Sequence, residues 1–217
     1  MADVVCSLLE KGIAKLGLEV SSHQLKSLVA YVDLLEHWNK TYNLTAIRDR
    51  SDIAVRHILD SLSVVPSVKG SSVIDVGTGA GLPGIPIAVI RPEKAVALLD
   101  SNGKKTRFLH QVVTSLCLSN VRVFHARARD HKVAAGYDHV VTRAFATSAK
   151  IVDECAHLLT ASGTILAMKS MSADQELESL DQRVSVLAKS ALQVPYLDES
   201  RVLVILKPTP CTNESSA

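Results

Sequence analysis

The sequence lacks the patterns that mark zinc, disulfide and membrane proteins. Its cysteines, Cys6, Cys117, Cys155 and Cys211, lie far apart and form no C-x-x-C pair, which argues against a zinc site and a disulfide framework. No apolar run approaches the roughly 18 residues of a membrane span, and the first residues have no basic start typical of a signal peptide. We therefore expect a cytoplasmic protein with reduced thiols, without a metal or a membrane partner.

Aromatic residues and net charge are also scarce. Phe, Trp and Tyr make up 4% of the chain, so few side chains can stack on bases, and the net charge of +2 says little about partners. The 47% hydrophobic and 21% charged content is typical of a globular unit with one core. We predict a helical cap over residues 1–66, a core over 67–208 and a disordered, polar tail over 209–217.

The N-terminal part has helical periodicity. Apolar residues recur at three-to-four spacing from Leu25 to Trp38, and Ser21 and Ser22 are suited to cap this helix. A loop is expected over residues 39–50. A second helix should cover 51–64 and end before Pro66.

Further along, short apolar strands alternate with helices, which predicts a parallel sheet covered on both faces. The strands are expected at 72–76, 95–99, 121–124, 139–142 and 164–168, and the helices between them at 84–90, 103–116 and 148–159. Two last strands, 184–194 and 201–207, should form an antiparallel pair at the edge of the sheet. This pattern predicts an α/β, Rossmann-like fold of the class I methyltransferase type, with seven mostly parallel strands under an N-terminal helical cap.

A glycine-rich turn, DVGTGAGLPG over residues 75–84, follows the first expected strand. Glycine has no Cβ, so the backbone can turn sharply and approach a ligand closely. Ligands of parallel sheets bind at the carboxyl ends of the strands. Asp100 ends the next strand, where its carboxylate can accept hydrogen bonds from two ribose hydroxyls. The turn and Asp100 together indicate a cofactor that contains adenosine.

The segment from Gly79 to Gly84 also matches G-x-G-x-x-G, the motif of a dinucleotide-binding turn. Asp75, which can face a cationic ligand, favours S-adenosyl-L-methionine instead. Pro83 and Pro86 remove N–H groups that a pyrophosphate-binding helix needs, and the chain after Asp100 is too short for a second domain. A nucleotide oxidoreductase and a loop that only turns the chain remain the alternatives.

Beyond this turn, the chain resembles the bacterial 16S rRNA guanine-N7 methyltransferases, once called the glucose-inhibited division protein B family. The resemblance spans about residues 25–207. It is carried by WNKTYNLT at 38–45, RHILDS at 56–61, residues 75–86, LLDSNGKKTRFL at 98–109, RAFA at 143–146 and AMK at 167–169. It implies S-adenosyl-L-methionine as cofactor and 16S rRNA in the small ribosomal subunit as partner.

The resemblance also implies cofactor contacts, which add to those expected from the turn and Asp100. Together the predicted cofactor-binding residues are Gly77, Gly79, Leu82, Asp100, Ala128, Arg129 and Arg143. The family usually has an aliphatic residue followed by Glu where this chain has Ala128 and Arg129. Backbone contacts to adenine survive that change, whereas a side-chain acceptor is lost unless Asp130 replaces it.

Guanine N7 carries a lone pair and no proton, so it can attack a methyl group without a general base. The segment after the fourth strand lacks the proline pair typical of enzymes that methylate exocyclic amines. Cys117 and Cys155 fall on helices, on faces expected to be buried, where neither suits a nucleophile. We assign no catalytic residue, and we expect His57, Asn39 and Asp60 to have structural roles.

Binding to RNA requires positive charge, and several basic residues lie near the expected strand ends. The predicted RNA contacts are Lys104, Lys105, Arg107, Arg127 and Lys169. The oligomeric state is open, with a monomer favoured. The alternatives are a class I methyltransferase that acts on another RNA, a protein or a small molecule, and a protein that binds cofactor or RNA without turnover.

Overall fold

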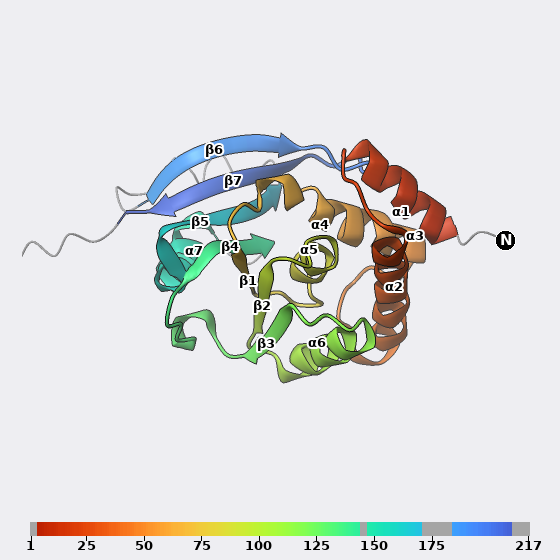
Figure 1. Cartoon of the computed structure of the whole chain (residues 1–217), viewed down its shortest axis with the longest axis horizontal. Coiled ribbons are helices and arrows are strands. Elements are labelled where there is room, and N and C mark those ends of the chain that lie inside the picture. The colour runs from red at the N-terminus through yellow and green to blue at the C-terminus, as the bar shows by residue number, and fades with distance from the viewer. Residues whose placement is uncertain (1–3, 144–146, 171–183, 210–217) are drawn as a thin grey trace, which may run out of the picture.

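The computed structural model, which describes residues 4–143, 147–170 and 184–209, has a seven-stranded sheet at its centre (Figure 1). The strands are β1 (Ser72–Val76), β2 (Ala95–Asp100), β3 (Val121–His125), β4 (Tyr137–Arg143), β5 (Leu159–Ser170), β6 (Val184–Leu192) and β7 (Arg201–Pro208). Their order in the sheet is β3-β2-β1-β4-β5-β7-β6. β1 to β5 pair in parallel, and β7 runs antiparallel to both β5 and β6. The predicted sheet with its terminal antiparallel pair is confirmed.

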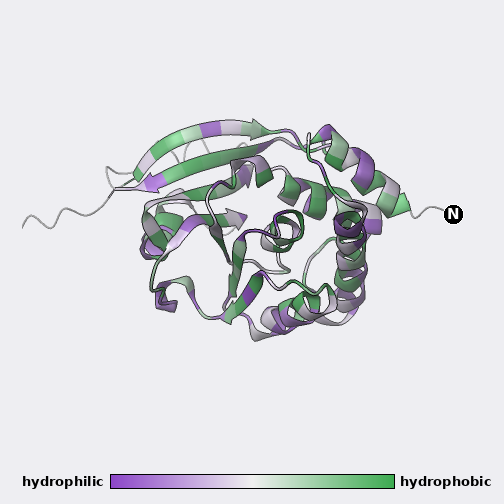
Figure 2. Cartoon of the chain, in the orientation of Figure 1, coloured by the Kyte–Doolittle hydropathy of each residue, from purple (hydrophilic) through white to green (hydrophobic). Residues whose placement is uncertain are grey.

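The central strands are apolar because helices cover both of their faces. One face packs against the cap, α5 (Gly84–Ile90) and α6 (Gly103–Ser115). The other packs against α7 (Ser148–Cys155) and the short helices η3 (Ala128–Asp130) and η4 (Ala156–Leu158). Figure 2 shows the resulting apolar colour along the inner strands and α5. β1 pairs with β2 on one side and β4 on the other, so the strand order reverses beside β1, where ligands bind in such sheets.

The cap is helical, as predicted. It contains α1 (Val4–Lys15), α2 (Ser22–Tyr42), α3 (Arg50–Ile53), η1 (Ala54–Leu59), α4 (Asp60–Leu62) and η2 (Val65–Ser67). Ser21 caps α2 in a reciprocal pair with Gln24. The helix extends four residues into the predicted loop, through Tyr42, and ends at Asn43, which adopts a left-handed φ of 48° and whose N–H bonds to Asn39 O.

The segment predicted as one helix over 51–64 is helical but not uniform. Residues Ala54–Leu59 form a π-helical stretch between α3 and α4. π-Helical turns widen the hydrogen-bonding pattern and are frequent at functional sites. Arg56 and His57 lie on this stretch and Asp60 follows it directly, so three polar residues of the cap lie on or beside the irregular part of the helix.

The cap and the sheet share one core. Tyr31 of α2 is fully buried and donates from its hydroxyl to Ala80 O in the glycine turn, at 2.5 Å. Gln24 Nε2 donates to Val89 O and Ile90 O at the end of α5, at 3.0 and 3.1 Å. Because these contacts join α2 to both ends of the segment from the turn to α5, the cap fixes the position of the glycine turn.

The predicted boundaries of the cap, core and tail are a separate matter from the fold. The division at residues 66 and 208 stays a prediction, and residues 210–217 of the predicted tail lie outside the described residues. Within the described ranges, no helix is long and apolar enough to cross a membrane. The same residues contain no group of three or more His, Cys, Asp or Glu side chains placed to hold a metal ion.

Candidate active site

The glycine turn joins β1 to α5 at the carboxyl ends of the parallel strands. The N–H groups of Gly77 and Thr78 donate to Leu99 O of β2, at 2.9 and 3.2 Å. Gly77 and Gly79 have φ values of 68° and 63°, in the left-handed region that residues with a Cβ rarely adopt. The turn therefore presents bare backbone at the tips of the strands.

Asp75 lies beneath this turn and holds it in place. Its side chain is fully buried, and Oδ2 accepts from Thr78 Oγ1 at 2.6 Å and from Gly84 N at 2.7 Å. Burial raises the pKa of Asp75 to about 7, although the bonds from Thr78 and Gly84 oppose that shift. The sequence suggested that Asp75 faces a cationic ligand. In the structure its carboxyl group instead faces the turn and the start of α5.

Asp100, at the end of β2, supports the turn from the neighbouring strand. Oδ2 accepts from Gly79 N at 2.9 Å, and Oδ1 accepts from Asn102 N at 2.8 Å. Lys105 Nζ lies 3.8 Å from Oδ2. Each carboxylate oxygen has a second lone pair, so these contacts leave acceptor capacity beside the turn.

A cavity of about 710 Å³ opens between the glycine turn, the cap and the carboxyl ends of β4 and β5. The turn contributes Gly77 to Ala80 and Leu82 to its wall, and the strands contribute Thr142, Arg143 and residues 167–170. The cap supplies Leu44, Thr45, Ile47, Arg56, His57 and Asp60. Three segments that are distant in the sequence thus enclose one site.

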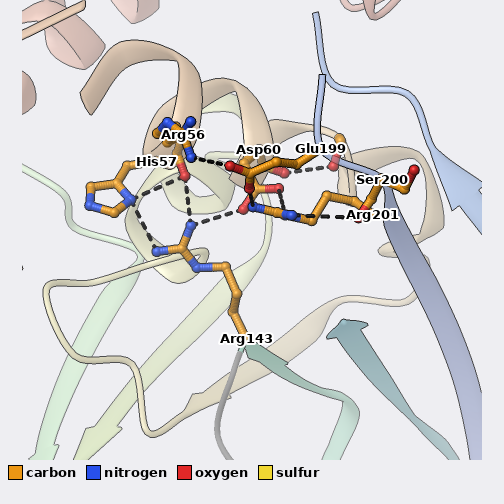
Figure 3. Close-up of polar contacts among 8 residues, drawn as sticks. Arg56, His57, Asp60, Arg143, Glu199, Ser200 and Arg201 are labelled. Carbon is orange, nitrogen blue, oxygen red and sulfur yellow. Dashed lines mark hydrogen bonds and ion pairs between the residues drawn. The ribbon is translucent and has the colours of Figure 1, made fainter. Parts of the chain in front are cut away.

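Arg143 ends β4 and points toward the cap (Figure 3). Its Nη1 donates to Asp60 Oδ2 at 2.9 Å and to Arg56 O, on the π-helical stretch, at 3.0 Å. Asp60 is 2% exposed and Arg143 21% exposed at their side chains. A charge this enclosed requires a partner, and Asp60 supplies it. The expected role of Asp60, to fix the cap to the sheet, matches this contact.

His57 lies beside Arg143 in the wall of the cavity. Its Nδ1 is 3.3 Å from Arg143 Nη2 and 3.1 Å from Arg56 O, while Nε2 is 2.8 Å from Thr45 Oγ1. Burial and the positive charge of Arg143 lower the pKa of His57 to about 4. The ring is therefore neutral near pH 7 and has polar neighbours at both nitrogens, as expected of a structural histidine.

Asn39 has the structural role expected of it. Its Nδ2 donates to Ile47 O at 3.0 Å, and its Oδ1 accepts from Thr45 N at 2.9 Å. These bonds fold the loop after α2 back onto the helix. Thr45 and Ile47 are thereby held in the wall of the cavity.

The sequence did not single out a second arginine beside Asp60. Arg201 begins β7, and its Nε lies 3.4 Å from Asp60 Oδ1. Glu199, in the turn before β7, accepts from Arg56 Nη1 at 2.6 Å and from Arg201 Nη2 at 2.8 Å. The register of β7 on β5 places Arg201 opposite Ser170, at the edge where the cavity opens, and the sequence carries no signal for this register.

The structure brings together half of the residues predicted to bind cofactor or RNA. Those that line the cavity are Gly77, Gly79, Leu82, Lys105, Arg143 and Lys169. Those outside its lining are Asp100, Lys104, Arg107, Arg127, Ala128 and Arg129. Asp100 still contacts the wall through Gly79 and Lys105. Lys104, Arg107 and Arg127 have exposed side chains, and Ala128 is buried at the start of η3.

Known proteins resemble this chain over nearly its whole length. A family model described as rRNA small subunit methyltransferase G matches residues 24–204. The ribosomal RNA small subunit methyltransferase G of Enterobacter sp. (strain 638) is 44% identical over 200 residues, which cover 92% of this chain and 97% of that protein. The one from Vibrio cholerae is 46% identical over 195 residues, covering 89% and 93%. The chain belongs to the rRNA small subunit methyltransferase G family.

Solved structures share the fold at much lower identity. TYW2 from M. jannaschii, in complex with AdoMet, superposes with a TM-score of 0.54 at 18% identity, over 68% of this chain and 72% of that one. TrmN from Thermus thermophilus gives a TM-score of 0.53 at 16% identity, over 68% and 47%. These likenesses concern the fold alone, and they confirm the predicted class I methyltransferase architecture.

Arg129 is the position where this chain was expected to depart from its family. Its side chain is 62% exposed and pairs with Glu154 of α7, with Nη2 3.3 Å from Oε1. Lys150 Nζ lies 4.0 Å from the same oxygen. The acidic partner of this arginine therefore comes from the neighbouring helix.

The cysteines gave one correct and one wrong prediction. Cys155, at the end of α7, is fully buried, and burial raises the pKa of its thiol to about 12. Cys117 was expected to be buried on a helix, but it is exposed and follows α6 with a left-handed φ of 53°. Neither lines the cavity. Cys211 and residues 144–146 of the RAFA segment lie outside the described residues.

Proposed function

We propose that this chain transfers the methyl group of S-adenosyl-L-methionine to N7 of a guanine in the 16S rRNA of the small ribosomal subunit. Its family membership supports a methyltransferase that acts on small-subunit rRNA. The observation that carries the proposal is the cavity, which places the bare backbone of the glycine turn opposite a wall rich in basic side chains.

The residues around the turn fit S-adenosyl-L-methionine. The cavity of about 710 Å³ is within the range of small-molecule sites, about 300–1,000 Å³. Thr142 lines it, and its buried Oγ1 has no hydrogen-bond partner among the residues that the structure describes, which leaves a polar group for a ligand to satisfy. The proposed cofactor-binding residues are Gly77, Gly79, Leu82, Asp100, Ala128, Arg129 and Arg143.

When bound, the cofactor supplies an electrophilic methyl group on a sulfonium sulfur. Guanine N7 has a lone pair and no proton to remove, so the chain does not need a general base. The residues of the cavity fit that requirement. His57 is a weak base with a pKa of about 4, and Asp60, the carboxylate in the described lining, is paired with Arg143 and Arg201. We infer that the side chains act by orientation and electrostatics.

The charge of the cavity favours an anionic substrate. Its wall carries Arg56, Lys105, Arg143, Lys169 and Arg201, against Asp60. We propose that RNA contacts Lys105 and Lys169 in the cavity and Lys104, Arg107 and Arg127 outside it. Small ribosomal subunits are cytoplasmic, so we propose that the chain acts in the cytoplasm. We also propose that it acts as a monomer and without a metal.

The proposal is tested by incubating the protein with methyl-labelled S-adenosyl-L-methionine and small ribosomal subunits. We expect label in 16S rRNA. Label in ribosomal protein, in another RNA or in a small molecule would indicate a different substrate, and absence of label would indicate a protein without turnover. Affinity for the RNA should also fall steeply with salt, because phosphate contacts release counterions. An affinity independent of salt would reject the proposed phosphate contacts.

A further inference from the structure

Glu199 bridges two arginines that line the cavity (Figure 3). Its two carboxylate oxygens are divided between them: Oε1 is 2.6 Å from Arg56 Nη1, and Oε2 is 2.8 Å from Arg201 Nη2. Arg56 belongs to the cap and Arg201 to the start of β7, so the fold rather than the local sequence brings them together. Glu199 itself is not part of the cavity wall. The carboxylate therefore lies at the rim of the cavity, between two arginines that belong to its wall.

We propose that Arg56 and Arg201 form a binding site for a backbone phosphate of the RNA substrate, and that the Glu199 carboxylate occupies this site until the phosphate displaces it. The inference rests on the proposed methylation of RNA. A phosphodiester carries one negative charge and two free oxygens, as a carboxylate does. Both anions fit the forked donors of guanidinium groups. Displacement therefore exchanges one bridging monoanion for another.

The contacts of Glu199 are easily exchanged because they are open to water. Its side chain is 47% exposed and that of Arg56 is 39% exposed. Solvent screens ion pairs of this kind, and they contribute little to the stability of a fold. The hydrogen bonds from Arg56 and Arg201 lower the pKa of Glu199, which favours the charged carboxylate. RNA thus competes with a local anion of equal charge.

The arginines, in contrast, keep other contacts when Glu199 leaves. Arg201 is 22% exposed, and its Nε lies 3.4 Å from Asp60 Oδ1. Asp60 is almost fully buried and is also held by Arg143. Arg56 Nε lies 4.0 Å from Asp52 Oδ1, a weaker contact. Both cations therefore remain at the rim, so the site does not need to be rebuilt for phosphate.

The test compares Glu199→Gln with the unchanged protein in binding to small ribosomal subunits and in methyl transfer to them. The substitution keeps the size of the side chain and removes the competing charge. We expect the Kd and KM for subunits to fall by about two- to fivefold, the equivalent of a typical exposed ion pair. The kcat and the affinity for S-adenosyl-L-methionine should not change.

Two further variants make the result specific. Glu36→Gln is the matched control, because Glu36 also bridges two cations, Arg50 and Lys40, but does not line the cavity. It should leave the Kd for subunits unchanged. Arg56→Gln keeps the backbone carbonyl that Arg143 uses and should weaken binding. It should also lower the salt slope by about 1 and cancel the gain from Glu199→Gln in the double variant.

The inference is overturned if Glu199→Gln binds subunits no more tightly than Glu36→Gln, or more weakly. Glu199 would then serve only to tie the turn before β7 to the cap, which a lowered melting temperature would reveal. Failure of the proposed function has a different signature, because the unchanged protein would then transfer no methyl group to 16S rRNA. Methylation by the unchanged protein without an effect of Glu199→Gln would reject the phosphate site alone.

Discussion

Arg143 Nη1 lies 2.9 Å from Asp60 Oδ2, and this pair joins the carboxyl end of β4 to the helical cap. Asp60 also faces Arg201 through its other oxygen, at 3.4 Å. One nearly buried carboxylate thus sets the position of an arginine from each of two strands. The shape of the cavity depends on this carboxylate, although the residue comes from outside the sheet.

We predict that Asp60→Asn lowers the free energy of unfolding by about 2 kcal/mol, because hydrogen bonds to a charged group are lost and Arg143 loses its counter-charge. Denaturant titration measures this effect. Affinity for S-adenosyl-L-methionine should fall as well, since Arg143 is no longer oriented. Asp52→Asn, which removes an exposed carboxylate near Arg56, is the control. If cofactor affinity is unchanged in Asp60→Asn, Asp60 has only a structural role.

A second prediction concerns His57. Its pKa in the folded protein is about 4, below the ordinary 6.5, so the unfolded chain binds more protons between these values. The stability contributed by the neutral ring is therefore complete above pH 6.5 and is lost as the pH falls toward 4. Relative to His57→Gln, the protein should lose up to about 3 kcal/mol over this interval. A difference in unfolding free energy that does not vary with pH would contradict the assignment.

Asp75 should act in the opposite direction over the same interval. Its folded pKa of about 7 lies above the ordinary 3.8, so the folded state holds the proton more tightly. Stability from the protonated group is present below about pH 4 and is lost as the pH rises through 7. The protein should therefore lose stability relative to Asp75→Asn between pH 4 and 7. Because His57 and Asp75 offset each other, the wild-type profile alone is uninformative and each variant has to be compared with it.

The glycine turn allows a matched pair of substitutions. Gly77 lines the cavity with a φ of 68°, so Gly77→Val should weaken binding of S-adenosyl-L-methionine by at least about tenfold, or about 1.4 kcal/mol. Gly17 has a φ of 67°, and apart from its chain neighbours no atom of the described residues lies within 4 Å of its Cβ position. Gly17→Val should lower stability by about 1–2 kcal/mol through backbone strain and leave cofactor binding unchanged. Calorimetric titration of both variants separates loss of the pocket from strain.

Most of the sheet could be predicted from the sequence because its central strands are buried on both faces. Val73 and Ile74 of β1 and Leu98 of β2 are fully buried, and such strands appear as continuous apolar runs. The glycine turn could also be predicted from the sequence, because its left-handed backbone favours glycine. Asp100 could be predicted because it ends an apolar strand. Helix ends were less visible: α2 continues beyond the predicted boundary until the left-handed Asn43 ends it.

The remainder of the site depends on contacts between distant segments. Asp75 was expected to face a ligand, but its carboxylate accepts hydrogen bonds from Thr78 and Gly84. The pattern of a strand does not reveal whether a carboxylate at its end binds the backbone or a ligand. The π-helical stretch that exposes Arg56 O to Arg143 has the same apolar periodicity as an ordinary helix. Arg201 reaches the cavity only through the register of β7 on β5, which also brings Glu199 beside Arg56. Sequence patterns identified the glycine turn and Arg143 in the cavity wall and missed Arg201 and its partner Glu199.

The position of the transferred methyl group tests the central proposal most directly. Methylation at N7 places a positive charge on guanine and makes the RNA chain cleavable there by reduction and aniline treatment. After incubation with the protein and S-adenosyl-L-methionine, 16S rRNA from small ribosomal subunits should be cleaved at a specific guanine, and Gly77→Val should reduce that cleavage. Methyl label incorporated into 16S rRNA without any aniline-sensitive guanine would contradict transfer to N7.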